Sequence, residues 1–245
     1  MEEFEHLSNA PIQEAILDLR LSFRATPERS LFEPLKSALL QSYPLSSDIQ
    51  QFHAEVNFDG GAGSLNQNTQ FAGLRFQSAN NGFVFQAQAN GFTLSKLRPY
   101  TSWGDLKQEA QRLWAIYFAT LGPSTVERIA CRYVNRFEVP KRDFDFKEYL
   151  VAPPDLPSNL PQGVSRYLLQ QEVPVPESRA TVLLTQAVEG VTGSAVSFLL
   201  DIDAFKLLSL DASLGEWWSE IDDLAKLKNR FFFASVTELA KRDFR

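Results

Sequence analysis

The sequence predicts an α+β fold, in which one antiparallel sheet carries long helices packed on one of its faces. Apolar and polar residues alternate over much of the chain, as they do in half-buried strands. Two segments, 103–121 and 214–233, instead repeat apolar residues at helical spacing. The pairs Asn81-Gly82 and Asn90-Gly91 indicate hairpin turns, which make the strands on either side antiparallel.

Length, charge and cysteine content limit the class of protein. The 245 residues, 44% of them hydrophobic, suit one large domain over 1–245. A net charge of −6 argues against attraction of the whole surface to nucleic acid or to an anionic membrane. The single Cys excludes an intramolecular disulfide and fits a reducing compartment. The acidic N-terminus is not that of a signal peptide, and no apolar run approaches the roughly 20 residues of a membrane helix. We therefore predict a cytoplasmic protein without a membrane partner.

The elements of the first half follow from these patterns. Pro27-Glu28 opens the first helix and Pro44 stops it, while Ser102 is the expected N-cap of the long helix and Gly122 ends it. In order, we predict a strand at 14–23, a helix at 27–42, strands at 51–58, 71–77, 82–88 and 92–97, and the helix at 103–121.

The second half repeats this order of elements. We predict a strand at 128–139, a short helix at 144–150, a Pro-rich loop at 151–164, strands at 165–173, 179–188 and 195–202, the helix at 214–233 and a last turn at 237–241. Several apolar residues recur 114 positions later, among them Phe23 as Phe137, Trp103 as Trp217 and Leu113 as Leu227.

These matches predict a duplicated unit, with halves 1–122 and 123–245 related by a pseudo-two-fold axis. Both long helices would then cover one face of the sheet and leave the other open, as in a saddle or a helix-grip cup. The alternative is an α+β domain whose order of elements only looks repeated.

Three segments resemble a sporadically distributed family of uncharacterised bacterial proteins of about this length. They are APIQEAILDLRL (10–21), LSKLRPYTSW (94–103) and RIACRYVNRFEV (128–139). In that family an Ala-Pro-Ile…Glu-Ala start, a Ser-Lys-Leu…Pro-Tyr…Trp middle and an Arg-Tyr-Asn strand recur in this order. The resemblance extends as far as Val139. It implies one intact bacterial domain, and it brings no activity and no catalytic residue with it.

Basic residues gather on the strand 128–139, which is a local exception in an acidic chain. They are Arg128, Arg132 and Arg136, which share one face of the strand, followed by Lys141 and Arg142. Arginines in a row can bind a phosphate, a carboxylate or an acidic protein segment through bidentate contacts. The alternative is that they pair with Glu14 and Asp18 on a neighbouring strand, or are solvated.

A second set of candidate binding residues surrounds the start of the long helix. Arg98, Tyr100 and Trp103, with Lys96 beside them, could hold an anion at the helix N-terminus; alternatively, the two aromatic rings pack the corner between strand and helix. Asn135 lies on the apolar side of its strand and must find hydrogen-bond partners, either in a ligand or in a loop or helix end.

Catalytic and metal-binding patterns are sparse. His6 and His53 belong to no zinc-binding pattern, and Cys131 lies on an apolar strand face, as a core residue does. Asp201 and Asp203 share a strand face and could hold Mg²⁺ or act as a carboxylate pair, although a strand end facing water needs neither role. The glycine-rich loop 59–64 lacks the Gly-Lys-Ser/Thr ending of a phosphate loop and is expected to be a hairpin tip. We predict no cofactor and no dedicated metal site.

The sequence is compatible with three functions. The first is a non-enzymatic binding or regulatory protein that recognises an anionic small molecule or an acidic partner on the open sheet face. The second is a protein-interaction component of a bacterial defence or toxin-antitoxin type system, and the third a metal-dependent hydrolase that uses Asp201 and Asp203. The aromatic runs Trp217-Trp218 and Phe231–Phe233 are expected to pack the core, and one of these Phe side chains could join a second subunit in a homodimer.

Overall fold

The computed structural model of the chain describes residues 4–5, 7–59, 62–80, 82–140, 145–191 and 194–245, with the backbone alone for 53–68 and 191. The strands are β1 Ile12–Ser22, β2 Leu45–Asp59, β3 Ala62–Gln77, β4 Phe83–Gln88, β5 Gly91–Leu97, β6 Thr125–Pro140, β7 Leu168–Val175, β8 Ala180–Val191 and β9 Ala195–Asp211. The helices are η1 Arg29–Phe32, α1 Glu33–Leu39, α2 Trp103–Leu121, α3 Phe146–Tyr149, η2 Pro176–Ser178, α4 Trp217–Ser235 and α5 Glu238–Phe244.

The strands form one antiparallel sheet in the order β2-β3-β4-β5-β1-β6-β9-β8-β7. The predicted α+β class with a large antiparallel sheet is therefore confirmed. β1 and β6 lie at its centre and pair with each other, with Ala15 opposite Tyr133. β5 flanks β1 and β9 flanks β6, so each central strand has the last strand of its own half on its outer side.

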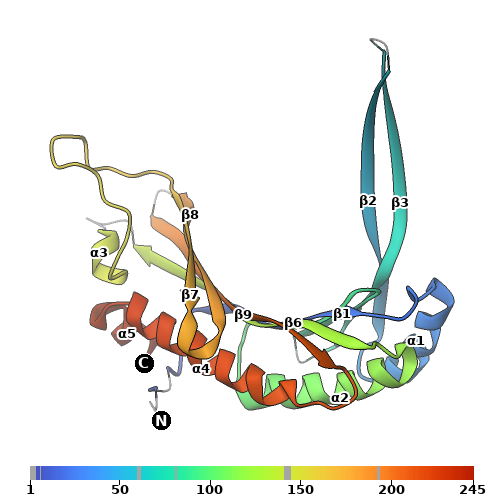
Figure 1. The fold of residues 1–245 in the computed structure, drawn as a ribbon. Coiled ribbons are helices and arrows are strands. Elements are labelled where there is room, and N and C mark those ends of the chain that lie inside the picture. Colours follow the sequence, from blue (N-terminus) through green and yellow to red (C-terminus); the bar gives the residue numbers. More distant parts are fainter. Residues whose placement is uncertain (1–3, 6, 60–61, 81, 141–144, 192–193) are drawn as a thin grey trace.

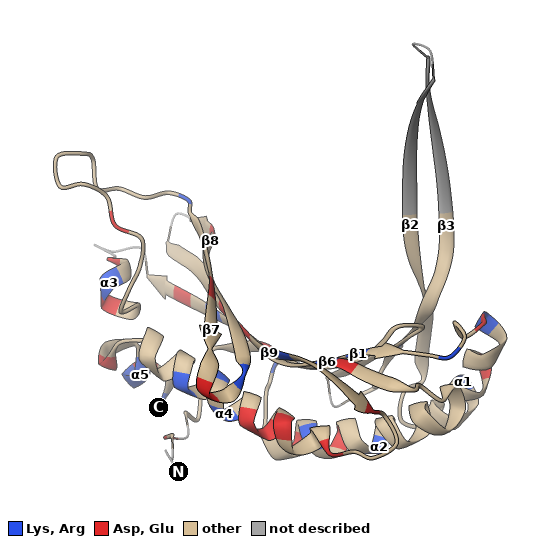
Figure 2. Cartoon of the chain, viewed as in Figure 1, with Lys and Arg blue, Asp and Glu red and all other residues tan. Residues whose placement is uncertain are grey.

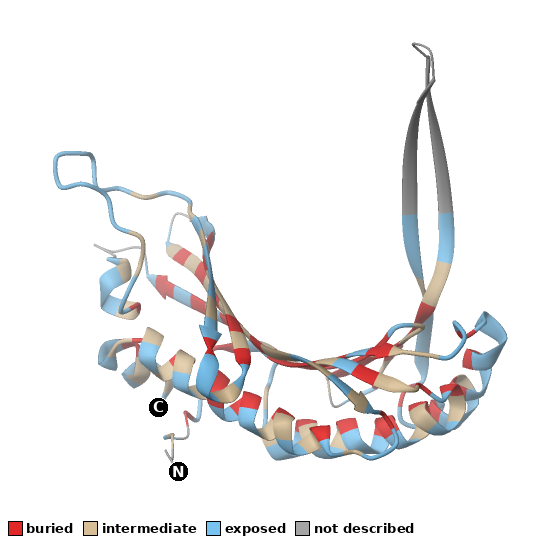
Figure 3. Ribbon diagram, in the orientation of Figure 1, coloured by how far each residue is buried: buried red, intermediate tan, exposed pale blue. Residues whose placement is uncertain are grey.

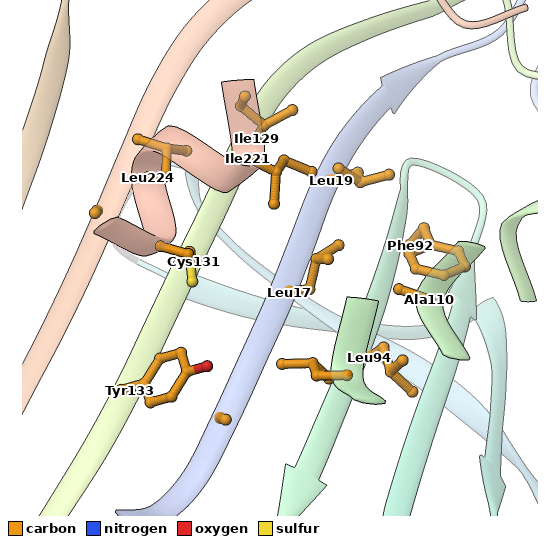
Figure 4. Packing of buried hydrophobic residues seen from close by; sticks show 14 of the residues in the cluster. Leu17, Leu19, Phe92, Leu94, Ala110, Ile129, Cys131, Tyr133, Ile221 and Leu224 are labelled. Carbon is orange, nitrogen blue, oxygen red and sulfur yellow. The ribbon is translucent and has the colours of Figure 1, made fainter. Parts of the chain in front are cut away.

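The sheet is curved, and α1, α2, α4 and α5 lie along its convex side (Figure 1). Strands in the middle of the sheet alternate between buried and more exposed residues (Figure 3), because one side of each strand contacts the helices. Figure 4 shows Leu17 of β1 and Cys131 of β6 grouped with Ile221 and Leu224 of α4. We call the opposite, concave side the open face.

Helix α2 shows how the sequence sets these elements. The Ser102 hydroxyl accepts a hydrogen bond from the Asp105 backbone N–H at 3.1 Å and so caps the first turn. Gly122 then ends the helix in the left-handed conformation, with φ 60°. Between them the buried stripe packs on the sheet and on α4, and the Trp114 and Trp217 ring centroids lie 4.9 Å apart.

Two predicted helices are shorter in the structure. The segment 27–42 forms the 3₁₀ turn η1 and then α1, which ends at Leu39. Pro34 stands in the first turn of α1, where its missing N–H costs nothing, so it marks a second helix start inside the predicted span. The short helix predicted at 144–150 is α3, Phe146–Tyr149; residue 144 lies outside the described residues.

Several strands are longer than the predicted ones, above all β2, β3 and β9. β3 pairs with β4 only from Gly73 to Gln77, whereas β2 and β3 pair along their whole lengths. Beyond Gly73 the two strands therefore continue as a two-stranded ribbon that stands away from the sheet (Figure 1). Gly60 and Gly61 of the predicted hairpin tip 59–64 lie outside the described residues.

The Pro-rich loop 151–164 lies at the end of the sheet near α3 and β8, away from the central strands (Figure 1). The Gln186 side-chain amide of β8 donates a hydrogen bond to the Ala152 carbonyl at 3.3 Å and so ties the loop to that end. The open face over β1 and β6 is left uncovered by this loop.

Candidate functional site

The structure divides the predicted binding residues between the two sides of the sheet. Arg128, Arg132 and Arg136 of β6 alternate with residues that pack in the core on the helix side, so they share the open face. The remaining four line a cavity on the helix side. They are Arg98, Tyr100, Trp103 and Asn135.

Carboxylates on β1, β9 and β8 pair with the three arginines of the open face. Arg128 bridges Asp18 of β1 at 3.1 Å and Asp203 of β9 at 2.8 Å. Basic and acidic residues accordingly lie close together on the central strands (Figure 2).

The other two arginines have partners that sequence reasoning did not name. Arg132 makes a bidentate pair with Asp201, with Nη2–Oδ2 at 2.6 Å. Arg136 pairs with Glu189 of β8, also at 2.6 Å. The charge that was expected to attract an anion is therefore balanced within the sheet. Lys141 and Arg142, which would extend the positive run, lie outside the described residues.

Asp201 and Asp203 share a strand face, as predicted, but each of them holds an arginine. Burial raises the pKa of Asp203 above its ordinary value, and the adjacent Arg128 opposes that rise. Within the described residues, no group of three or more His, Cys, Asp or Glu side chains is placed to bind a metal ion. Each carboxylate of this pair therefore has an arginine partner in the structure.

The cavity on the helix side has a volume of about 580 Å³. It lies between the N-terminal segment, the start of α2 and the second half of α4. Its wall includes Phe4, Leu7, Asn9, Arg98, Tyr100, Trp103, Tyr133, Asn135, Asp222, Lys228 and Phe232. Exposed residues of the wall, such as Arg98 and Ser102, open it to solvent.

Lys228 of α4 is the buried cation of this cavity. Its residue is only 7% exposed, and Nζ lies 3.4 Å from the centroid of the Tyr133 ring. Nζ donates a hydrogen bond to Asn229 Oδ1 at 2.5 Å. Burial lowers the pKa of Lys228 from its ordinary value of 10.5 to about 8, since an ammonium group loses hydration there.

Two phenol groups meet on the same wall. The Tyr100 and Tyr133 hydroxyl oxygens lie 2.7 Å apart, and their rings pack edge to face with centroids 5.3 Å apart. Burial raises the pKa of both phenols well above its ordinary value. Both hydroxyls therefore stay protonated at neutral pH and can donate hydrogen bonds.

Hydrogen bonds hold the other predicted residues of the wall in place. Trp103 Nε1 donates to Asp222 of α4 at 3.0 Å, and Lys107 Nζ contacts the same carboxylate at 2.6 Å. The Asn135 amide donates to the Leu200 carbonyl at 3.0 Å, so its partner is the backbone of β9. Tyr100 and Trp103 thus pack a corner and line the cavity at the same time.

Sequence reasoning missed Lys228 and Tyr133 as parts of the site. Lys228 continues the buried stripe of α4 that runs from Trp217 through Ile221 and Leu224, at the spacing of successive helical turns. A lysine on an apolar stripe is the signal that could have pointed to it.

Cys131 and the aromatic run of α4 behave as core residues. Burial raises the pKa of the Cys131 thiol to about 12, which keeps it from acting as a nucleophile at neutral pH. Phe232 is buried, and Phe233 stacks on Phe4 with ring centroids 5.1 Å apart.

No protein-family model matches the chain. No curated protein sequence is significantly similar to it. None of the helices in the described ranges is both long and apolar enough to cross a membrane.

Proposed function

We propose that the protein binds an anionic small molecule in the cavity between α2, α4 and the N-terminal segment. The observation that carries this is Lys228, a buried amine on the cavity wall that forms no ion pair with a described residue. The acids on the wall already have basic partners: Asp222 binds Lys107, and Glu5 binds Arg245 at 2.8 Å. An anion is the ligand that would balance the charge of Lys228.

The wall also indicates the shape of this ligand. A volume of about 580 Å³ lies within the range for drug-sized molecules. Trp103, Tyr133 and Phe232 offer aromatic surface, and Arg98 at the exposed edge can meet a carboxylate or phosphate. A planar or aromatic organic acid fits these contacts best.

Ligand binding is tested by thermal unfolding and calorimetry with a panel of aromatic carboxylates and phosphates. We expect Lys228→Met and Arg98→Ala to weaken binding by at least roughly tenfold, which corresponds to the loss of about 1.4 kcal/mol. Arg132→Ala is the matched control, because it removes an arginine of the open face and leaves the cavity unchanged. Binding that depends on Arg132 and not on Lys228 would move the site to the open face.

We also propose that the two halves are copies of one unit. Helices α2 and α4 start and end 114 residues apart, and β5 and β9 end at Leu97 and Asp211, again 114 apart. Each half places its first strand at the centre of the sheet beside its own last strand. A duplicated ancestor would produce this matched order, and it is consistent with membership of the sporadically distributed bacterial family that the sequence resembles.

A further inference from the structure

We propose that Lys228 binds an α-keto acid covalently, through a reversible imine between its Nζ and the keto carbon. The inference rests on the proposed function, since it uses the same cavity and the same anionic class of ligand. It goes further in naming the reacting atom and the group that reacts with it.

The first support is the position of the amine. Lys228 lies on the wall of a cavity large enough for an organic acid, while its residue is 7% exposed. Its neighbours include the Tyr133 ring, the Asn229 amide oxygen and the buried Cys131 thiol, which burial keeps protonated at neutral pH. None of them neutralises an ammonium ion as a carboxylate would, so the uncharged amine is favoured here more than at the surface.

Lys226 shows what an ordinary lysine of the same helix looks like. It pairs with Asp223 at 2.8 Å, and its side chain is 60% exposed. The two lysines are two residues apart in α4 and both line the cavity, with Lys226 at its exposed edge. They form an internal comparison of a buried and an exposed amine.

The second support is the tyrosine pair beside Lys228. Imine formation needs a proton donor, first for the carbonyl oxygen and then for the hydroxyl group that leaves as water. The hydroxyls of Tyr100 and Tyr133 are hydrogen-bonded to each other at 2.7 Å, and the Tyr133 ring contacts Nζ. Protonated phenols on this wall can relay a proton to the oxygen of a bound ketone.

The chemistry balances without a further reagent. The Nζ lone pair forms a bond to the keto carbon, and the oxygen takes up a proton as the nitrogen loses one, which gives a carbinolamine. The carbon–oxygen bond then breaks, and the oxygen leaves as water with both hydrogens of the amine. Carbon and nitrogen remain joined by a double bond, and nothing is oxidised or reduced. The carboxylate of the keto acid takes no part in these steps.

Phenylpyruvate with sodium cyanoborohydride tests the inference on the full chain. Reduction traps the imine as a stable amine and adds the mass of the probe less one oxygen atom. We expect a single addition, mapped to Lys228 by peptide mass spectrometry, that forms faster than labelling of any other lysine. Lys36→Met, which removes a lysine of α1 outside the cavity wall, should label as the wild type does, and Lys228→Met should lose the addition.

Lys228→Arg and phenyllactate separate covalent from ordinary binding. Arginine keeps the charge but forms no such imine, and phenyllactate has the shape of the probe without its keto group. Thermal stabilisation by phenyllactate with no trapping at Lys228 would overturn the imine and leave the proposed function standing. Trapping spread evenly over surface lysines, with no stabilisation by either compound, would overturn both. Circular dichroism of each variant confirms that it is folded.

Discussion

The Lys228 amine is buried, and burial lowers its pKa from 10.5 to about 8. Such a shift links the charge of one side chain to the stability of the whole fold. Below pH 8 the native state must keep a buried ammonium ion. Between the two pKa values the unfolded chain holds a proton that the native state has released, so the free energy of unfolding rises with pH across this window.

We therefore expect Lys228→Met to change the pH dependence of stability. Relative to the wild type, the variant should be more stable at about pH 7, with an advantage that shrinks by on the order of 2–3 kcal/mol by about pH 10. Urea unfolding at both values measures this difference. Lys226→Met, an exposed neighbour, should show no comparable change. An advantage that stays constant with pH would mean that Lys228 does not titrate in this range.

Sequence could predict the residues of the site that are neighbours in the chain. Arg98, Tyr100 and Trp103 line one cavity, and they lie within six consecutive residues of the chain. Of the carboxylates that pair with the arginines across the sheet, it named only Asp18, which pairs with Arg128. The partners of Arg132 and Arg136 lie more than fifty residues away, on β9 and β8. Which strand lies beside β6 depends on packing of the whole sheet, so the ion pairs could not be derived from local patterns.

At the scale of elements, the bend between the sheet and the β2–β3 ribbon depends on Gly73. The register between β2 and β3 shifts at this point, and Gly73 has φ 154°. A Cβ atom here would lie 2.1 Å from the Ala87 carbonyl oxygen of β4. A side chain cannot be accommodated without moving one strand away from the other.

Gly73→Ala should consequently destabilise the protein by about 2–4 kcal/mol, as steric strain in a packed sheet does. Gly190→Ala is the control: it also lies at a register shift, but its added Cβ meets no atom within 4 Å. We expect that variant to stay within about 0.5 kcal/mol of the wild type. Chemical denaturation of the two variants gives both values, and equal effects would contradict the role of the close contact.

Element boundaries were predictable where one signal dominated. Ser102 and Gly122 delimit α2, because capping is local chemistry. β9 was predicted to end at Ile202 and continues to Asp211, since Phe205 and Leu207 place apolar groups on the open face and remove the alternation. For α1, the start signal at Pro34 was overlooked in favour of Pro27.

At the scale of the whole molecule, the two halves meet along the β1–β6 ladder and between α2 and α4. The N-terminal segment adds a third contact, because the Asn9 N–H donates to the Phe244 carbonyl at 2.9 Å and Phe4 stacks on Phe233. The chain passes from one half to the other through the turn at Gly122. Noncovalent contact between the halves is thus extensive.

We expect the chain to tolerate a break after Gly122. Fragments 1–122 and 123–245, produced together, should purify as a one-to-one complex that retains ligand binding, since the β1–β6 pairing needs no covalent link. Each fragment alone exposes the edge of a central strand and should aggregate or remain unfolded. Size-exclusion chromatography measures whether the fragments form the complex, and circular dichroism measures whether each fragment alone is folded. Two fragments that each fold as stable monomers would show that the central ladder is dispensable.

The β2–β3 ribbon has a consequence for how this chain can vary among related genes. β3 pairs with β4 only over Gly73–Gln77. The residue pairs of the ribbon beyond Gly73 therefore make no backbone pairing with the rest of the sheet. Inserting residues in opposed pairs would lengthen the ribbon, and deleting such pairs would shorten it. Either change amounts to roughly 3.3 Å for each residue of one strand. The curved body and its cavity would keep their geometry, so reach and ligand chemistry are able to evolve independently.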